Sequence, residues 1–465
     1  MRERYPRFLD ALIWPAVILG DALILLCFIA GQFLVVQMFH GRQEDLAITG
    51  GAFGAVYVLV VHWGAWMGTR VGFKRMVVAG AVITIIAPLV LAQASGLWGV
   101  AAGTGLIGLG GGIMWPNVEA ELARGRQGAA LRKRFSFFNT MWCLGTLAGP
   151  LLSRWVYPVE SVVGSAGGRQ AVNAAFYWSS AMAVGVAVLM ALWRTRIPPA
   201  GEVHAEHLSE AGRACNLLHA ESAAESRPRV QQVSSPNDAP DEPPRDPARL
   251  RAFLLMSYVA NLMCYVVLGV LRQLYEALAN HQWKGREAAH IHAWMLVLLA
   301  GASCAMFAVL YFAHRWPYRI KRYVFWQAVM VCGLMAIATT GNIPLVAAGF
   351  ILVGVATSFF YSGSLFYSIE GRAESKHMAG WHEMIIGLGN LAGLLLAGNV
   401  PALLGKMGVR DEEWLIRSPY LVVAGLFAAG AAVQLAIYAR HRPRFAAEHD
   451  QVHDPGNPAG PPPPA

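Results

Sequence analysis

Long apolar stretches alternate with short polar or glycine-rich connections along most of the chain. Each stretch is close to the roughly 20 residues that a helix needs to cross the apolar core of a bilayer. Backbone groups cannot stay unpaired in lipid, so runs of this length are predicted to be helices. Twelve spans are predicted, over residues 11–38, 46–68, 76–95, 97–121, 132–156, 173–193, 252–274, 290–313, 323–340, 343–367, 378–404 and 418–439.

The composition agrees with a membrane protein. Hydrophobic residues make up 56% of the chain and charged residues 14%, whereas a soluble domain carries about 25% charged residues. The net charge of +9 is compatible with nucleic-acid binding, but the basic residues are dispersed in small groups between apolar runs. A positive-inside bias explains that pattern better, so no nucleic-acid partner is expected.

Lysine and arginine distribution predicts the orientation. The side that carries both termini holds more than twice as many of these residues as the opposite side. The bias predicts cytoplasmic termini in a multi-pass protein of the cytoplasmic (inner) membrane. The first apolar run has no small-residue cleavage site after it, so we interpret it as a retained span and not as a signal peptide.

The six cysteines form no CxxC pair, and we expect neither a disulfide framework nor a metal site. A GxGxxG spacing begins at Gly103. It lies inside an apolar run and follows no strand, so helix packing through small residues is the better interpretation. The sequence predicts no cofactor and no catalytic residue.

Two internal matches predict two parallel halves. Residues 69–74 resemble residues 314–319 at an offset of 245, and LGTLAGPLL (144–152) resembles LGNLAGLLL (388–396) at an offset of 244. The predicted fold is therefore an all-α membrane bundle of twelve helices in two pseudo-symmetric halves, 1–193 and 251–440. The polar, proline-rich segment 194–250 is predicted to be a partly disordered cytoplasmic linker, and 441–465 a disordered proline-rich cytoplasmic tail.

This plan resembles the major facilitator superfamily, and the loop between the second and third spans is similar to that family's signature. Arg70, Gly72, Lys74 and Arg75 match the signature, while Thr69 stands at its acidic position, so the usual gating ion pair lacks its acid. The resemblance implies a site near the bilayer midplane between two halves that rock around it. We expect the protein to be a monomer.

Ionisable groups at membrane depth are costly and are functional candidates by default. Asp21, near the middle of the first span, is interpreted as a carrier of a proton or of a cationic substrate group, with hydrogen-bonded packing as the alternative. His382 and Glu383 begin like a zinc-protease helix, but Ile386 stands where the second histidine is required, so that interpretation is discarded. Asn139 is the pseudo-equivalent of Glu383, which suggests that both face the central cavity. The candidates for substrate or proton binding are Asp21, Asn139, Trp142, Tyr265, Tyr361, His382 and Glu383.

Aromatic residues inside the spans are either a cavity wall that stacks on a substrate ring or ordinary bundle packing. They include FFYSGSLFY (359–367), Trp142 and Tyr265. Arg272, near the outer end of the seventh span, either attracts an anion or extends to the interface.

Three glutamates end spans four and ten. Glu119, Glu121 and Glu370 are interpreted either as an inner gate, paired with arginines such as Arg124 and Arg134, or as solvated helix ends, which we favour. The gating candidates are Thr69, Arg70, Gly72, Lys74, Arg75, Glu119, Glu121, Arg134, Arg315 and Glu370.

The sequence predicts a secondary active transporter for a small, neutral or singly charged organic solute, with the proton as coupling ion. The expected partners are the solute, the proton and the lipid bilayer. One alternative is a transporter-derived sensor or scaffold, because Thr69 departs from the signature and the fourth span lacks the arginine often found there. A second alternative is a membrane-embedded transferase that uses His382 and Glu383.

Overall fold

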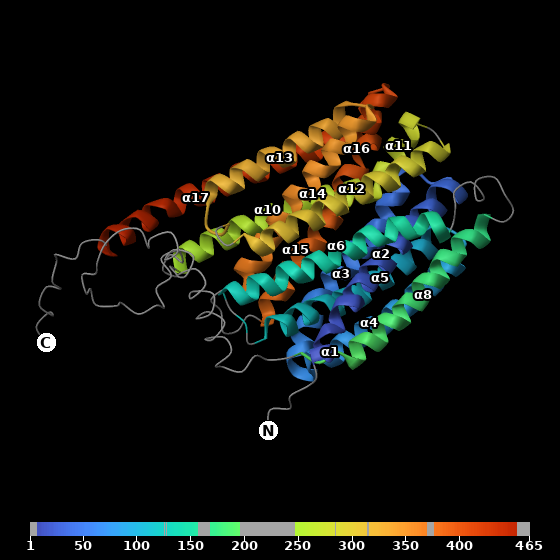
Figure 1. Ribbon diagram of the computed structural model, residues 1–465. Helices are drawn as coiled ribbons and strands as arrows, with labels where there is room; N and C mark the ends of the chain where they lie inside the picture. The colour runs from blue at the N-terminus through green and yellow to red at the C-terminus, as the bar shows by residue number, and fades with distance from the viewer. Residues whose placement is uncertain are drawn as a thin grey trace, which may run out of the picture.

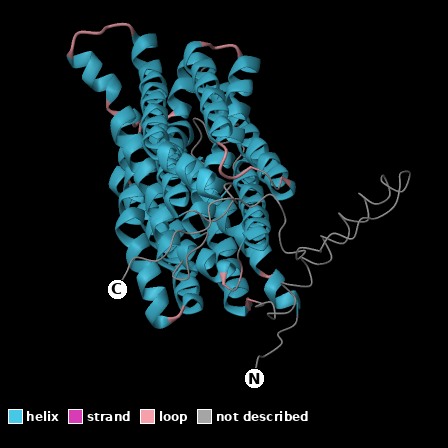
Figure 2. Cartoon of the chain, turned by 90° about the vertical axis from the view of Figure 1, so that its left-hand side faces the viewer, coloured by secondary structure: helices cyan, strands magenta, loops and turns pink. Residues whose placement is uncertain are grey.

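The computed structural model describes residues 7–124, 126, 128–156, 168–195, 247–283, 285–313, 316–369 and 376–452. The regular structure of this described part is entirely helical, and the long helices run side by side in one bundle (Figures 1 and 2). Arg315, Glu370 and most of the predicted linker 194–250 lie outside the described residues.

Helices before the linker form one half of the bundle. They are α1 (Arg7–Ala11), α2 (Ile13–Phe33) with the π-helical turn η1 (Leu34–Met38), α3 (Gln43–Val71), α4 (Phe73–Gln93), α5 (Leu97–Ala123), α6 (Gly128–Val156) and α8 (Gly168–Leu192). Within this half, α2 packs against α6 and α8, and α5 packs against α3 and α4.

Helices after the linker form the other half. They are α10 (Pro247–Gln273), α11 (Tyr275–Trp283), α12 (Gly285–Phe312), α13 (Ile320–Thr339), α14 (Ile343–Ile369), α15 (Lys376–Gly398), α16 (Val400–Lys406) and α17 (Glu412–Val452). Here α10 packs against α15 and α17, and α14 packs against α12 and α13. The two halves meet mainly where α3 runs along α15 and α6 runs along α12, and Figure 1 shows the blue-to-green and yellow-to-red halves side by side.

Eleven helices of the described part are long and apolar enough to cross a membrane. Helix α6, which contains polar residues such as Arg134 and Asn139, is not among these eleven. It is 29 residues long and packs in the same bundle. The helix bounds agree with the predicted spans to within a few residues at most ends. There are two clear differences: the eleventh predicted span breaks at Asn399, between α15 and α16, and α17 continues to Val452.

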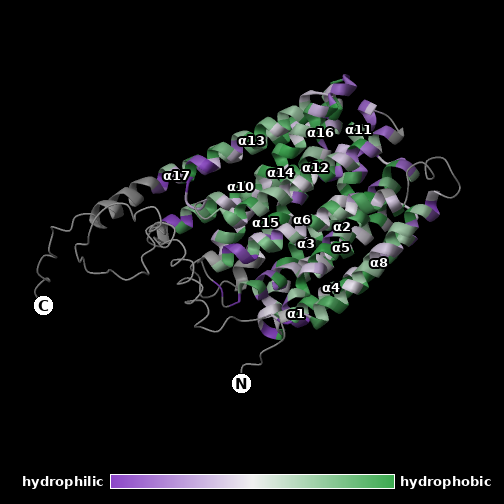
Figure 3. Cartoon of the chain, viewed as in Figure 1, coloured by the Kyte–Doolittle hydropathy of each residue, from purple (hydrophilic) through white to green (hydrophobic). Residues whose placement is uncertain are grey.

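Hydrophobic residues predominate along the helices, and hydrophilic residues gather toward the helix ends (Figure 3). Leu59, Trp98 and Phe312 are each more than 70% exposed. Large apolar side chains that face outward over most of a surface indicate contact with lipid. The chain is therefore a multi-pass integral membrane protein.

Repeated glycines make an equivalent close helix crossing in each half. Gly149 of α6 lies against α2, where an added Cβ would be 2.6 Å from Leu25 Cβ and 2.9 Å from the Ala22 carbonyl oxygen. Its repeat partner Gly393, in α15, lies against α10, where an added Cβ would be 2.9 Å from Val266 Cα. The same sequence match therefore makes the same close helix crossing in each half.

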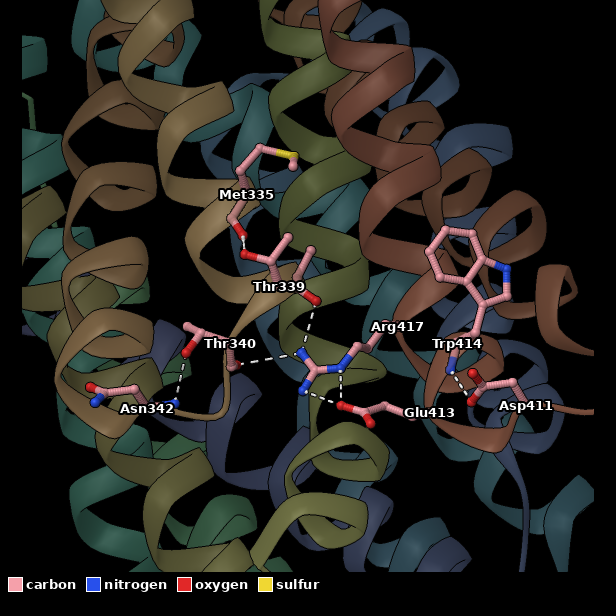
Figure 4. Close-up of polar contacts among 9 residues, drawn as sticks. Met335, Thr339, Thr340, Asn342, Asp411, Glu413, Trp414 and Arg417 are labelled. Carbon is pink, nitrogen blue, oxygen red and sulfur yellow. Dashed lines mark hydrogen bonds and ion pairs between the residues drawn. The ribbon is translucent and has the colours of Figure 1, made fainter.

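Polar contacts tie helix ends together at the end of the bundle away from the termini. Arg417 of α17 donates to the Ala338 carbonyl of α13 at 2.8 Å and pairs with Glu413 at 3.0 Å (Figure 4). The last carbonyls of a helix have no partner within it, so Arg417 satisfies one end of α13 while it joins α13 to α17.

Candidate functional site

A cavity lies between the two halves. It contains about 860 Å³ of empty space, counting the solvent to which it opens. Side chains from both halves line it, so it is placed where a change in their relative position would alter access. The lining residues include Asp21, Phe28, Phe53, Tyr57, Trp115, Glu119, Trp142, Tyr265, Arg272, Tyr361, Glu383 and Asn390.

Contacts between the halves are present at both ends of this cavity. On the side away from the termini, Gln32 of α2 donates to Gln273 at 2.6 Å and to the Arg272 carbonyl at 2.8 Å. On the other side, the rings of His62 and Trp381 lie 5.5 Å apart. Neither pair is covalent, so each contact can open without disturbing the helices that carry it.

Asp21 and Arg272 belong to opposite halves and line the same cavity. Asp21 is only 3% exposed, and the hydroxyl of Thr146 donates a hydrogen bond to its carboxylate. The guanidinium carbon of Arg272 lies 5.9 Å from the centre of the Trp142 ring. Arg272 therefore lines the cavity, and its attraction for an anion stays a prediction.

Aromatic rings form one wall of the cavity. Trp142 and Tyr361 are stacked, with centroids 5.8 Å apart and planes at 13°. Tyr265 follows at 6.2 Å from Tyr361. The three rings come from α6, α10 and α14, so the two halves share this wall, which offers flat apolar faces to a bound molecule.

A second group of polar residues lies nearer the end of the bundle at which α1 begins. Glu119 of α5 approaches His382 and Glu383 of α15, with one ligand-type atom of each residue within 4.8 Å of the others. Tyr57 donates a hydrogen bond to Glu383, and Tyr361 donates one to Glu119 at 3.3 Å. Glu119 is fully buried, so its interpretation as a solvated helix end is wrong: α15 of the other half covers it.

The signature loop turns as expected but makes its described contacts within its own half. Gly72 joins α3 to α4 with φ of 106°, a value that favours glycine. Arg70 stacks over Trp66 at 4.2 Å, and Lys74 donates to the Trp193 carbonyl at the end of α8. Thr69 bonds back to the Trp66 carbonyl at 2.7 Å, and Arg75 is exposed.

The remaining gating candidates are also paired locally. Glu121 pairs with Arg124 at 2.8 Å, one turn further along the chain. Arg134 pairs with Asp10 of α1 at 2.9 Å. These contacts of described residues stay within the N-terminal half. Arg315 and Glu370, their candidate counterparts in the other half, lie outside the described residues.

Not every predicted residue lines the cavity. Asn139 and His382 are buried, at 1% and 0% exposure, and are absent from its lining. Tyr57 and Thr146, the donors to Glu383 and Asp21, were not predicted from the sequence. The internal repeat could have pointed to Thr146, because the same offset of 244 makes it the equivalent of Asn390, a polar residue that lines the cavity.

Known proteins share both the sequence profile and the fold. The sequence profile of the Major Facilitator Superfamily matches residues 14–380, and no curated protein matches the sequence. The human organic anion transporter MFSD10 (TETRAN) has a TM-score of 0.60 at 14% identity, covering 91% of this chain and 99% of that one. A bacterial homolog of the human lysosomal transporter Spinster, inward-facing and unoccupied, has a TM-score of 0.61 at 13% identity, covering 99% and 100%. A POT family transporter in complex with 5-aminolevulinic acid has a TM-score of 0.64 at 11% identity, covering 95% and 98%. Identities this low indicate a shared fold only.

Proposed function

The chain belongs to the major facilitator superfamily of membrane transporters, and on that premise we propose that it moves a small organic solute by proton-coupled alternating access. The observation that supports this most directly is the cavity between the halves, where Asp21 and Arg272 face the same space from opposite sides of the bundle. Alternating access around a midplane site needs a cavity whose walls belong to both moving parts.

In the proposed topology α6 also crosses the membrane, which brings the number of spans from eleven to twelve, and both termini lie in the cytoplasm. An even number of spans brings both chain ends to one side, and that side carries the excess of lysine and arginine. We place the protein in the cytoplasmic (inner) membrane as a monomer.

The walls of the cavity support a proposal for the class of solute. Stacked Trp142 and Tyr361 provide an apolar face, and Arg272 adds one positive charge opposite the carboxylate of Asp21. A molecule with a flat or apolar body and no more than one net charge matches these walls better than a polyanion. Sugars, nucleosides, amino acids and drug-like amphiphiles all meet this description.

Asp21 is proposed as the proton carrier. Its carboxylate lies on α2 and the guanidinium of Arg272 on α10, so ionised Asp21 attracts the opposite half through the cavity. Protonation of Asp21 removes that attraction. A proton taken up at Asp21 would then alter the balance between arrangements of the halves, which is what coupling requires.

The first test uses purified protein in detergent and a panel of sugars, nucleosides, amino acids, carboxylates and hydrophobic cations. A solute that binds the folded state raises its stability by about 2.7 kcal/mol at 100 times its Kd. Hits then enter proteoliposomes with an imposed pH gradient. We expect Asp21→Asn to lose gradient-driven accumulation while it keeps solute exchange, with Glu287→Gln as a control at an exposed carboxylate outside the cavity. Unchanged accumulation by Asp21→Asn would refute the assignment.

A sensor or scaffold is the second candidate. Its support is Thr69 at the acidic position of the signature, together with a loop whose described contacts remain in its own half. Binding of a solute without any exchange across proteoliposomes would favour this candidate over transport.

A further inference from the structure

Three side chains with metal-ligand chemistry meet across the interface of the two halves. Glu119 belongs to α5, whereas His382 and Glu383 belong to α15. Their ligand-type atoms lie within 4.8 Å of one another, and their exposures are 0%, 0% and 4%. A metal site was not expected from the sequence, because the helix of His382 lacks a second histidine. The third ligand instead comes from the other half, as Glu119.

In the part of the chain that the structure describes, no basic side chain balances the charge of this cluster. The described hydrogen-bond partners of the three residues are the hydroxyls of Tyr57, Tyr361 and Ser364, and the carboxyl groups of Glu119 and Glu383 also contact each other. Within the described part of the chain, no lysine or arginine forms an ion pair with either carboxylate. Buried carboxylates without a countercharge are costly, and a bound cation would remove that cost.

Two buried atoms of the cluster also lack partners. The Nε2 atom of His382 and the Oε2 atom of Glu119 have no hydrogen bond among the described residues. The other ring nitrogen of His382 lies 2.8 Å from the Ser364 hydroxyl, which holds the ring in orientation. Metal-ligating histidines have this arrangement, with one nitrogen fixed by a neighbour and the other left for the ion.

We propose that Glu119, His382 and Glu383 form a site for a first-row divalent cation, with Zn²⁺ as the best match. Metal–ligand bonds of about 2.0–2.2 Å bring the ligands of one ion to within roughly 4.4 Å of each other, which small side-chain adjustments reach from the observed separations. One imidazole and two carboxylates suit Zn²⁺ or Mn²⁺, and two carboxylates neutralise the double charge. Because Glu119 and Glu383 line the cavity, a fourth position is open to water or to a donor atom of a solute.

The position of the site gives the ion a defined effect. It joins α5 of one half to α15 of the other, so a bound ion favours the arrangement in which these helices are close. Metal binding at this place does not depend on transport of any solute, because it follows from the ligand set and its burial alone.

The test measures binding to chelator-treated, tag-free protein in detergent. Co²⁺ serves as a spectroscopic probe through its visible absorption, and Zn²⁺ is titrated by calorimetry. We expect one equivalent per chain, with Glu119→Gln and His382→Gln each weakening binding about 100-fold or more, because even second-shell partners contribute about 10–100-fold. His62→Gln is the control, since His62 is exposed and lies outside the cluster. All variants are compared for elution and unfolding temperature without metal.

If a variant fails to fold, X-ray absorption of the Zn²⁺-loaded wild type still tests the site, because it identifies the atoms that bind the ion. One imidazole with oxygen ligands supports the site, and sulfur ligation overturns it. The proposal also fails if wild-type protein takes up no Co²⁺, or if folded Glu119→Gln and His382→Gln bind as the wild type does. These readouts need neither solute nor flux, so their failure is distinct from failure of the proposed transport.

Discussion

Glu276 is expected to make this protein less stable as the pH rises from about 4.5 to about 7. It lies in the first turn of α11, between the spans formed by α10 and α12, and is 6% exposed. Burial raises the pKa of its carboxyl from 4.5 to about 7. The folded state therefore binds a proton more tightly than the unfolded chain does. Stability from this group is fully present below pH 4.5 and is lost as the pH rises through about 7.

The size of the effect follows from the shift. Each pKa unit corresponds to about 1.36 kcal/mol, so a shift of roughly 2.5 units amounts to about 3 kcal/mol between pH 4 and pH 8. Glu276→Gln keeps the shape of the side chain and removes the ionisation. We expect the variant to differ from the wild type by less than about 1 kcal/mol at pH 5 and to be more stable by up to about 3 kcal/mol at pH 8.

The measurement is thermal unfolding in detergent at pH 5, 6, 7 and 8, followed by tryptophan fluorescence. Other titrating groups are common to both proteins, so the difference between the two curves isolates Glu276. The Glu413→Gln variant serves as a control for removal of a carboxylate elsewhere in the same half, on the exposed side of α17. Parallel pH profiles for wild type and Glu276→Gln would show that the carboxyl is not desolvated as described.

Three further predictions concern packing and helix ends, all measured by thermal unfolding in detergent. Gly149→Ala should destabilise the protein by about 1–3 kcal/mol because the added methyl group overpacks the α2–α6 crossing. The control Gly425→Ala, whose methyl group meets open space, should leave the stability unchanged, and equal effects of the two variants would contradict the described crossing. Arg417→Gln should lower the stability by about 1–3 kcal/mol because it leaves carbonyls at the end of α13 unpaired. Glu413→Gln should lower it by less than about 1 kcal/mol because that carboxylate is exposed, and a larger loss for Glu413→Gln than for Arg417→Gln would be inconsistent with the described contacts. Gly72→Ala should cost about 1–3 kcal/mol through backbone strain at positive φ, and an unchanged unfolding temperature would argue against the described turn.

The helices could be predicted from the sequence because lipid leaves the backbone few alternatives. Hydropathy located the spans, and the offset of 244 placed Gly149 and Gly393 at equivalent positions of the two halves, where both make close crossings. The family was also predictable, since the signature loop and the repeat agreed, and the profile match confirms it. Asp21 was placed near the middle of its span by counting residues, and it lines the cavity. Its role as proton carrier stays a prediction.

The candidate site was only partly predictable because it depends on how the halves meet. Glu119 ends its span as expected, yet sequence position could not show that α15 covers it. The place of Arg272 beside Trp142 in the cavity wall could not be read from its position near the end of a span. Contacts across the interface join residues about 240 to 330 positions apart, and no local pattern reports on such separations.

The paired glycine crossings provide an internal reference for distance measurements. Because α2 and α6 touch where no side chain fits, and α10 and α15 do the same, neither pair has room to slide. Spectroscopic labels placed on the two helices of one pair should keep a constant separation whatever is bound. Distances between labels on different pairs report any movement of the halves. Four labelled positions therefore supply both the measured distances and the constant distances that serve as their reference.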